Sequence, residues 1–316
     1  MSSSAFVKCC CDGAQQMNVT FPATEMINPR FRDLDAWDPL FSLQAMWEGQ
    51  MAAAAAVQPA LPAIAAAAVA AAGRLADGGR LAYAGAGTSG RIGVQDGAEL
   101  PPTFDWPEAR LVLLMAGGEQ AFTRSIENAE DDREAAENAV VRHAIGAADV
   151  MIGIAASGST PFTVAALRAA RAAGALTIGL SNAAGGAVLA MAEHAILVET
   201  GAEVIAGSTR MKAGTAQKIV LNLLSSQLMV QLGRVHNGLM VDMQAKNDKL
   251  RLRALRMLGY LTGVADDDRL RTALAGASGR VKTAVLLVHG LDRAAADAAL
   301  ARNGGRLRAT LQEIGR

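Results

Sequence analysis

The sequence predicts an α/β fold in which helices cover both faces of a parallel sheet, a doubly wound arrangement. Short apolar runs alternate with helical patterns between residues 80 and 198, which is typical of parallel strands that are buried on both faces. Most of these runs end in Gly, Ser, Thr or Asn, small residues that let a ligand approach closely. Ligands of such sheets bind beyond the carboxyl ends of the strands, so we expect the functional site there.

Five apolar runs supply the predicted strands. They are Arg80–Ala84, Arg110–Ala116, Asp149–Ala155, Ala175–Leu180 and His194–Val198. Before the sheet, Leu40–Leu75 has a helical pattern that prolines interrupt. After it, Met211–Gln231 and Val241–Leu258 favour two further helices, and glycines divide residues 266–316 into short amphipathic helices.

These patterns divide the chain into four parts. Residues 1–24 are predicted to be a disordered leader, and residues 25–70 an N-terminal arm with helices. Residues 71–235 hold the sheet and the expected ligand site, and residues 236–316 form a helical C-terminal region. A chain of 316 residues, 51% of them apolar, is long enough for one large domain and a smaller appendage.

Charge and aromatic content argue against a nucleic-acid partner. Lys and Arg total 30, and so do Asp and Glu, so any anion site must be local rather than the product of a global positive field. Aromatic residues make up 4% of the chain, too few for a base-stacking surface. We therefore expect no nucleic acid to bind.

We also expect no membrane span and a cytoplasmic location. Residues 51–72 are apolar but mostly alanine, and Pro59 and Pro62 interrupt them, which favours a buried helical segment. Residues 1–16 lack the apolar core of a signal peptide. The only cysteines, Cys9–Cys11, fit a reducing compartment and complete no zinc site. No metal or other cofactor is expected.

The run Gly85–Gly90 matches the pattern G-x-G-x-x-G between a predicted strand and a helix. This is the fingerprint of dinucleotide sites, but the next strand ends in Gly117-Gly118 rather than in the acidic residue that the fingerprint requires. Thr88 and Ser89, with Gly90 and the backbone N–H groups of a helix N-terminus, instead favour a phosphate cradle.

A second hydroxyl-bearing turn follows the third predicted strand. Ser157, Gly158, Ser159 and Thr160 precede Pro161, which suits the first turn of a helix. These hydroxyl groups could simply cap that helix. Because two such turns follow neighbouring strands, we favour a phosphate bound between them over capping alone.

Two carboxylates are candidate acid–base groups. Glu99 has small or apolar neighbours and precedes Pro101-Pro102, and rigid apolar surroundings favour the protonated form of a carboxyl group. Glu130 lies in the acidic run Glu127–Asp132. Spacing alone explains Glu130 better as one more charge on a solvated surface.

Cations stand at the start of the predicted helix Met211–Gln231. Ser208, Arg210 and Lys212 come just before it or at its first turn. Cations are unfavourable at a helix N-terminus unless an anion or a partner neutralises them. A substrate contact and a subunit contact remain equally open explanations.

Several long motifs together resemble the N-acetylmuramic acid 6-phosphate etherases. They are Gly85–Phe104, Ala116–Asp131, Gly153–Pro161, Gly207–Lys218 and Leu239–Asp248, in that order. The resemblance covers most of the chain after residue 27 and is far more specific than a single glycine pattern. It implies a sugar isomerase (SIS) domain that binds phosphosugars at a dimer interface, followed by a small helical domain that is similar to ubiquitin-associated (UBA) domains.

The resemblance implies an enzyme that removes the D-lactyl ether of N-acetylmuramic acid 6-phosphate, with N-acetylglucosamine 6-phosphate and D-lactate as products. It implies a homodimer with the active site near the interface. The two functional glutamates of the family fall on Glu99 and Glu130. The implied phosphate contacts are Thr88, Ser89, Ser157 and Thr160.

Departures from the family pattern keep other readings open. Ser159 stands where the family usually has an arginine, Asn182–Gly185 replaces Asn-Pro-Gly, and Phe31 replaces a threonine. One alternative is a phosphosugar sensor without catalysis, resembling the glucokinase regulatory proteins; an aldose–ketose isomerase or a dinucleotide enzyme is another. The presence of both Glu99 and Glu130 favours the etherase, because a sensor does not need both.

Overall fold

The computed structural model describes residues 22–316 except residues 244 and 246. Residues 1–21, which hold most of the predicted leader and Cys9–Cys11, lie outside the described part. The short 3-10 helix η1 (Ala23–Glu25) opens the described chain, and the Thr24 side chain is buried. Thr24 is therefore already packed against the protein, although it lies within the segment that we expected to be a leader.

Five parallel strands form the central sheet in the order β2-β1-β3-β4-β5. They are β1 (Leu81–Gly85), β2 (Leu111–Met115), β3 (Val150–Ala155), β4 (Leu176–Ser181) and β5 (His194–Leu197). Each begins and ends within one residue of its predicted bounds. Every residue of β1, β3 and β4 is buried, which is why these strands are recognisable as continuous apolar runs.

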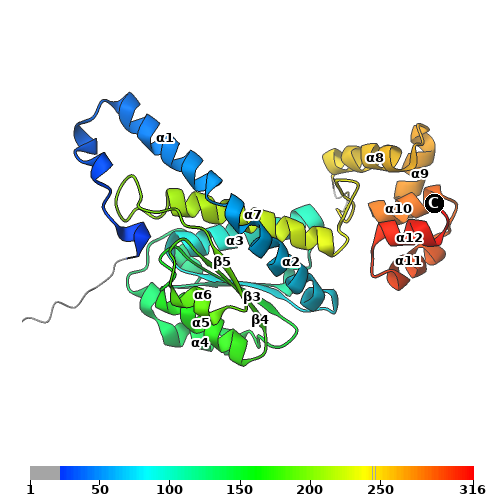
Figure 1. Cartoon of the computed structure of the whole chain (residues 1–316). Helices are drawn as coiled ribbons and strands as arrows, with labels where there is room; N and C mark the ends of the chain where they lie inside the picture. Colours follow the sequence, from blue (N-terminus) through cyan, green and yellow to red (C-terminus); the bar gives the residue numbers. More distant parts are fainter. Residues whose placement is uncertain (1–21, 244, 246) are drawn as a thin grey trace, which may run out of the picture.

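Helices cover both faces of the sheet, so the doubly wound prediction is confirmed (Figure 1). One face carries α4 (Arg133–Arg142), α5 (Pro161–Ala172) and α6 (Ala187–Met191). The other carries α2 (Leu61–Ala76), α3 (Gly87–Phe104) and α7 (Lys212–Gln231). Successive strand residues alternate between the two cores: Ala82 and Ala84 face the first, and Leu81 and Tyr83 face the second.

The N-terminal helices form one long apolar segment with a break. The helix α1 (Pro39–Ala55) is followed by η4 (Gln58–Ala60) and then by α2. By length and composition residues 39–76 could cross a membrane, with a mean hydropathy of 1.7 over their most apolar window. A core helix can have the same composition, however, and α2 buries Ile64, Ala68 and Leu75 against the sheet.

Glycines let α3 approach the sheet closely. Gly90, Gly93 and Gly97 lie three or four residues apart, so they share one face of the helix. A Cβ on Gly93 would lie 2.8 Å from the Ile154 Cδ1 atom, and one on Gly97 would lie 2.9 Å from the Leu113 Cδ2 atom. Larger side chains at these positions would push α3 away from the strands.

The C-terminal region begins with a small hairpin and continues as helices around a core of their own (Figure 1, orange and red). The hairpin consists of β6 (Val235–His236) and β7 (Leu239–Met240), and the helices are α8 (Asp248–Thr262), α9 (Asp267–Gly276), α10 (Val281–Val288), α11 (Arg293–Arg302) and α12 (Leu307–Glu313). The predicted helix Val241–Leu258 was wrong at its start. The Asn247 side chain accepts a hydrogen bond from the Leu250 N–H group at 2.9 Å, which caps α8 and fixes its beginning.

Gly179 tests how tightly α6 packs on β4. A Cβ at this position would lie 2.5 Å from the Val188 carbonyl oxygen, a backbone atom of α6. Because α6 itself would have to move, we expect Gly179→Ala to lower the free energy of unfolding by about 1–3 kcal/mol. Gly73→Ala is the control, since no atom lies within 4 Å of the new Cβ, and it should raise stability by about 0.5–1 kcal/mol. Denaturant unfolding measures both, and equal stabilities would contradict the packing described here.

Candidate active site

The turn after β1 brings the strand into direct contact with the start of α3. Gly87 has a φ of 52°, in the left-handed region that favours glycine. A Cβ on Gly90 would lie 2.7 Å from the Gly85 carbonyl oxygen. The outer glycines of the motif are therefore needed for strand–helix contact, and the middle one for the turn itself.

The turn after β3 lies beside it. Gly158 has a φ of 73°, and its carbonyl oxygen accepts a hydrogen bond from the Val188 N–H group at 2.9 Å. A Cβ on Gly158 would lie 2.6 Å from the Ser181 Oγ atom, so the turn is held closely by neighbouring segments. Gly85 of β1 pairs with Ile154 of β3, and the strand order reverses between these two strands. The two hydroxyl-bearing turns are thus neighbours at the switch point, where ligands of such sheets bind.

Helix capping does not account for the hydroxyl groups of the two turns. Among residues 22–243, 245 and 247–316, the side chains of Thr88, Ser89 and Thr160 have no hydrogen-bond partner, although Thr160 is the N-cap of α5. Only Ser157 makes a local bond, accepting from the Ser159 N–H group at 3.2 Å. These hydroxyl groups are therefore available to a ligand.

A buried carboxylate satisfies the N-terminus of α7. Glu203 is fully buried and accepts hydrogen bonds from the N–H groups of Lys212 at 2.8 Å and Ala213 at 2.9 Å. The Lys212 ammonium donates to the Ala202 carbonyl oxygen at 2.9 Å. Glu203, which sequence reasoning missed, thus supplies an anion at this helix N-terminus, where the sequence leaves a substrate contact and a subunit contact equally open. Arg210 is exposed.

Glu130 is exposed, as its spacing alone predicted, but it also lies beside the β1 turn. It belongs to η7 (Ala129–Asp131) and lines a cavity of about 210 Å³. The residues just after β1 and at the end of β2 line this cavity, and so do Arg91 and Arg124. The cavity is smaller than the ~300–1,000 Å³ that encloses a drug-sized ligand.

Glu99 lies elsewhere in the protomer and is exposed. It is twelve residues after Gly87 in α3, which corresponds to about 18 Å along the helix axis. Gly93, Gly97 and Leu100 turn inward, so Glu99 falls on the outer face. The apolar surroundings that we expected for Glu99 are not found, since its side chain is exposed in the described chain, and Glu99 does not line the Glu130 cavity.

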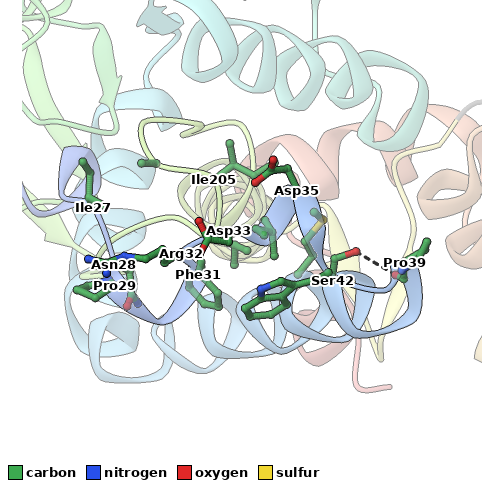
Figure 2. A pocket seen from close by; sticks show the side chains of 15 residues that line it. Ile27, Asn28, Pro29, Phe31, Arg32, Asp33, Asp35, Pro39, Ser42 and Ile205 are labelled. Carbon is green, nitrogen blue, oxygen red and sulfur yellow. Dashed lines mark hydrogen bonds between the residues drawn. The ribbon is translucent and has the colours of Figure 1, made fainter.

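The largest of the described cavities, about 730 Å³, lies between the N-terminal arm and the segment that precedes α7 (Figure 2). Phe31, Arg32 and Asp35 from the arm line it together with Val204–Ala206. None of the hydroxyl groups of the two turns contributes to it. We therefore place the candidate site at the strand ends rather than here.

Metal ligands are not gathered in the described part of the chain. Within it, no three His, Cys, Asp or Glu side chains lie so that they could hold a metal ion. The groups that the site does bring together are hydroxyls, backbone N–H groups, carboxylates and guanidinium groups.

Comparison with known proteins identifies the family. The chain matches the glucokinase regulatory protein N-terminal SIS domain over residues 63–171 and the SIS domain over residues 127–226. It is 50% identical to an N-acetylmuramic acid 6-phosphate etherase of Deinococcus radiodurans, over 92% of this chain and 95% of the relative. It is 47% identical to one of Streptomyces coelicolor, over 91% and 93%. The chain belongs to the N-acetylmuramic acid 6-phosphate etherase family.

A phosphoheptose isomerase of Francisella tularensis is among the similar solved structures. It is 18% identical, with a TM-score of 0.43, and the match covers 62% of this chain and 98% of that one. The etherase relatives, in contrast, match nearly the whole chain, including the arm and the C-terminal helices. The resemblance predicted from the motifs is thereby confirmed.

This member of the etherase family also has a buried carboxylate that sequence reasoning missed. Asp96 of α3 accepts hydrogen bonds from the Tyr83 hydroxyl at 2.8 Å, the Asn222 amide at 2.8 Å and the Ser225 hydroxyl at 3.1 Å. These donors come from β1 and α7, so one side chain joins three elements. Asp96 lies three residues after Gly93 and directly before Gly97, on the glycine-bearing face of α3 that packs on the sheet. This position is the signal that could have revealed it.

Asp96 gives the etherase fold a testable pH dependence. Burial raises the pKa of Asp96 above its ordinary value of 3.8, although the three donors oppose this shift. The native state therefore keeps a proton that the unfolded chain releases near pH 3.8, so this group's contribution to the free energy of unfolding falls as the pH rises through the native pKa. Asp96→Asn removes that component, and its stability relative to the wild type should rise with pH from about pH 4 upward.

Denaturant unfolding across a pH series measures this difference, and parallel curves for the two proteins would contradict it. Asp96→Ala is the companion variant. It leaves the buried Tyr83 and Ser225 hydroxyls and the half-buried Asn222 amide without their acceptor, so it should lower stability by about 2–4 kcal/mol at neutral pH.

Proposed function

We propose that this protein is an N-acetylmuramic acid 6-phosphate etherase that converts its substrate into N-acetylglucosamine 6-phosphate and D-lactate. The observation that carries the proposal is the arrangement at the strand ends: the two hydroxyl-bearing turns adjoin at the switch point, and the β1 turn also borders the cavity that Glu130 lines, in a chain half identical to an etherase. The reaction would serve N-acetylmuramate catabolism in peptidoglycan recycling, in the cytoplasm.

The two turns would hold the 6-phosphate. The N-termini of α3 and α5 supply backbone N–H groups, and the helix dipoles favour an anion there. The hydroxyl groups that are free to donate belong to Thr88, Ser89 and Thr160, and Ser157 lies in the same turn. Gly90 and Gly158 keep the backbone close to the ligand. Ser159 and Ser208 are further candidate contacts.

Two carboxyl groups suffice for the chemistry once the sugar ring is open. The aldehyde acidifies the proton on C2, which a carboxylate removes, while a carboxylic acid protonates the departing lactyl oxygen on C3. Water then adds across the double bond with the two roles reversed. We assign the base to Glu130 and the acid to Glu99, and each proton transfer would contribute roughly 10²–10⁴-fold. No cofactor takes part in these steps.

The two glutamates would meet across a homodimer interface. Glu99 faces outward from α3 and is remote from the Glu130 cavity of its own chain. The chain also exposes large apolar side chains: Phe41, Leu43 and Trp47 of α1 are 61–63% exposed, and exposed apolar side chains that gather into a patch mark an interface. A second copy of the chain could cover α1 and bring its Glu99 to the cavity. Arg210 and Lys212 would then lie near the contact.

Release of D-lactate from N-acetylmuramic acid 6-phosphate is the direct test. We expect the purified protein to form D-lactate and N-acetylglucosamine 6-phosphate in equal amounts. Binding of the substrate without release of lactate would instead identify a phosphosugar sensor, and an isomerised sugar would identify an isomerase.

Mixing two inactive variants tests the shared site. We expect Glu99→Gln and Glu130→Gln each to abolish turnover while phosphosugar binding persists. If each site takes Glu99 from one chain and Glu130 from the other, a randomly reassembled mixture has one intact site in every mixed dimer. Activity should then return to about a quarter of the wild-type value, since half of the dimers are mixed and half of their sites are intact. No recovery after verified subunit exchange would place both glutamates of a site in one chain.

Ser89→Ala tests the phosphate cradle. The phosphate is bound similarly in the ground state and the transition state, so we expect KM to rise with kcat nearly unchanged. The loss of one hydrogen bond to a charged group corresponds to an increase of about tenfold in KM. Steady-state kinetics with the muramyl phosphate measure this, and a change confined to kcat would contradict the assignment.

A further inference from the structure

Both backbone polar groups of Arg124, which lines the Glu130 cavity, are hydrogen-bonded. Its N–H group donates to the Gln120 carbonyl oxygen at 3.1 Å, and its carbonyl oxygen accepts from the Arg91 Nη2 atom at 2.9 Å. The Arg91 Nε atom also donates to the Ala121 carbonyl oxygen at 3.0 Å. Arg91, just after the β1 glycine motif, thus fastens this loop to α3 and sets where the Arg124 side chain begins.

The Arg124 guanidinium is the cation of this cavity that is free to bind a ligand. Arg91 is committed to two carbonyl oxygens, whereas the Arg124 side chain has no hydrogen-bond or ion-pair partner among the described residues. Glu127 and Glu130 line the same cavity, so its wall has no net positive charge. An anion can bind there only through directed donors, which a guanidinium group provides in a fixed planar arrangement.

The substrate of the proposed function carries two anionic groups at different positions. The phosphate on C6 is accounted for by the two hydroxyl-bearing turns. The carboxylate of the lactyl group hangs from C3, next to the carbon whose proton Glu130 would remove. Because C2 and C3 are bonded to each other, a cavity that brings Glu130 to C2 also brings the lactyl group to the other side chains on its wall.

We propose that Arg124 binds the lactyl carboxylate and thereby distinguishes the muramyl sugar phosphate from the glucosamine product. Arg91 acts on this contact indirectly, by positioning the loop. The inference rests on the proposed function and deepens it, since it assigns the group that makes the ether substrate different from other amino-sugar phosphates. It also explains why the product, which lacks the carboxylate, can leave a site that still binds its phosphate.

Arg124→Gln tests the proposal, with KM for N-acetylmuramic acid 6-phosphate as the first measurement. Loss of a charge-assisted contact should raise KM about tenfold or more. The inhibition constant of N-acetylglucosamine 6-phosphate should change less than about twofold, since that sugar lacks the carboxylate. The KM of Arg124→Lys should lie between those of the wild type and Arg124→Gln, because one ammonium group replaces a bidentate donor.

Arg133→Gln is the matched control. Arg133 is exposed at the start of α4 and does not line the cavity, so neither constant should change. An unchanged KM in Arg124→Gln would overturn the proposal, and so would a parallel rise in both constants, which would mean a phosphate contact or a misplaced loop. If the wild-type protein released no lactate, the proposed function itself would fail, and that outcome is distinct from the other two.

Discussion

The close approach of α3 to the sheet is the constraint on which the candidate site depends. Gly85 and Gly90 allow strand and helix backbones to touch, and this contact forms the β1 turn. Further along the helix, Asp96 holds α3 to β1 and α7 through three hydrogen bonds. The two contacts fix the rotation of α3 about its axis and its distance from the sheet. The exposed direction of Glu99 is a consequence of that rotation.

The same packing leaves large apolar side chains of α1 and α7 exposed. The helix α1 has no distinct polar face, because apolar side chains lie on every side of it among Ser42, Gln44, Glu48 and Gln50, yet only Ala45 and Ala53 of its residues are buried. A helix with apolar side chains on all sides is normally enclosed by protein, and Leu223 and Val230 of α7 are exposed as well. In the proposed homodimer, the second copy would bury these side chains. The same association would bring its Glu99 to the site. Assembly and activity would then be inseparable.

The sequence predicts the elements of this fold better than the directions of its side chains. Buried strands appear as continuous apolar runs, and motif order is enough to indicate the family. Whether Glu99 faces the core depends on which side of α3 is buried. Gly93 and Gly97 mark the buried side, but a sequence pattern reveals this only if glycines are counted as core residues. Glu203 meets Lys212 through a loop of irregular backbone, and no pattern predicts such a contact. The helix α8 starts late because a single capping side chain outweighs the apolar pattern before it.

Helix N-termini decide where an anion can bind in a chain without net charge. Among the helices that begin at the carboxyl edge of the sheet are α3, α5 and α7, and each could attract a phosphate through its free N–H groups. In α7 those groups are already bonded to the buried Glu203 carboxylate, whose charge would also repel a second anion. The N-termini of α3 and α5 have no capping side chain, and they flank the switch point. In the proposed function the phosphate would therefore bind between these two helices, and the rest of the substrate would extend toward Glu130.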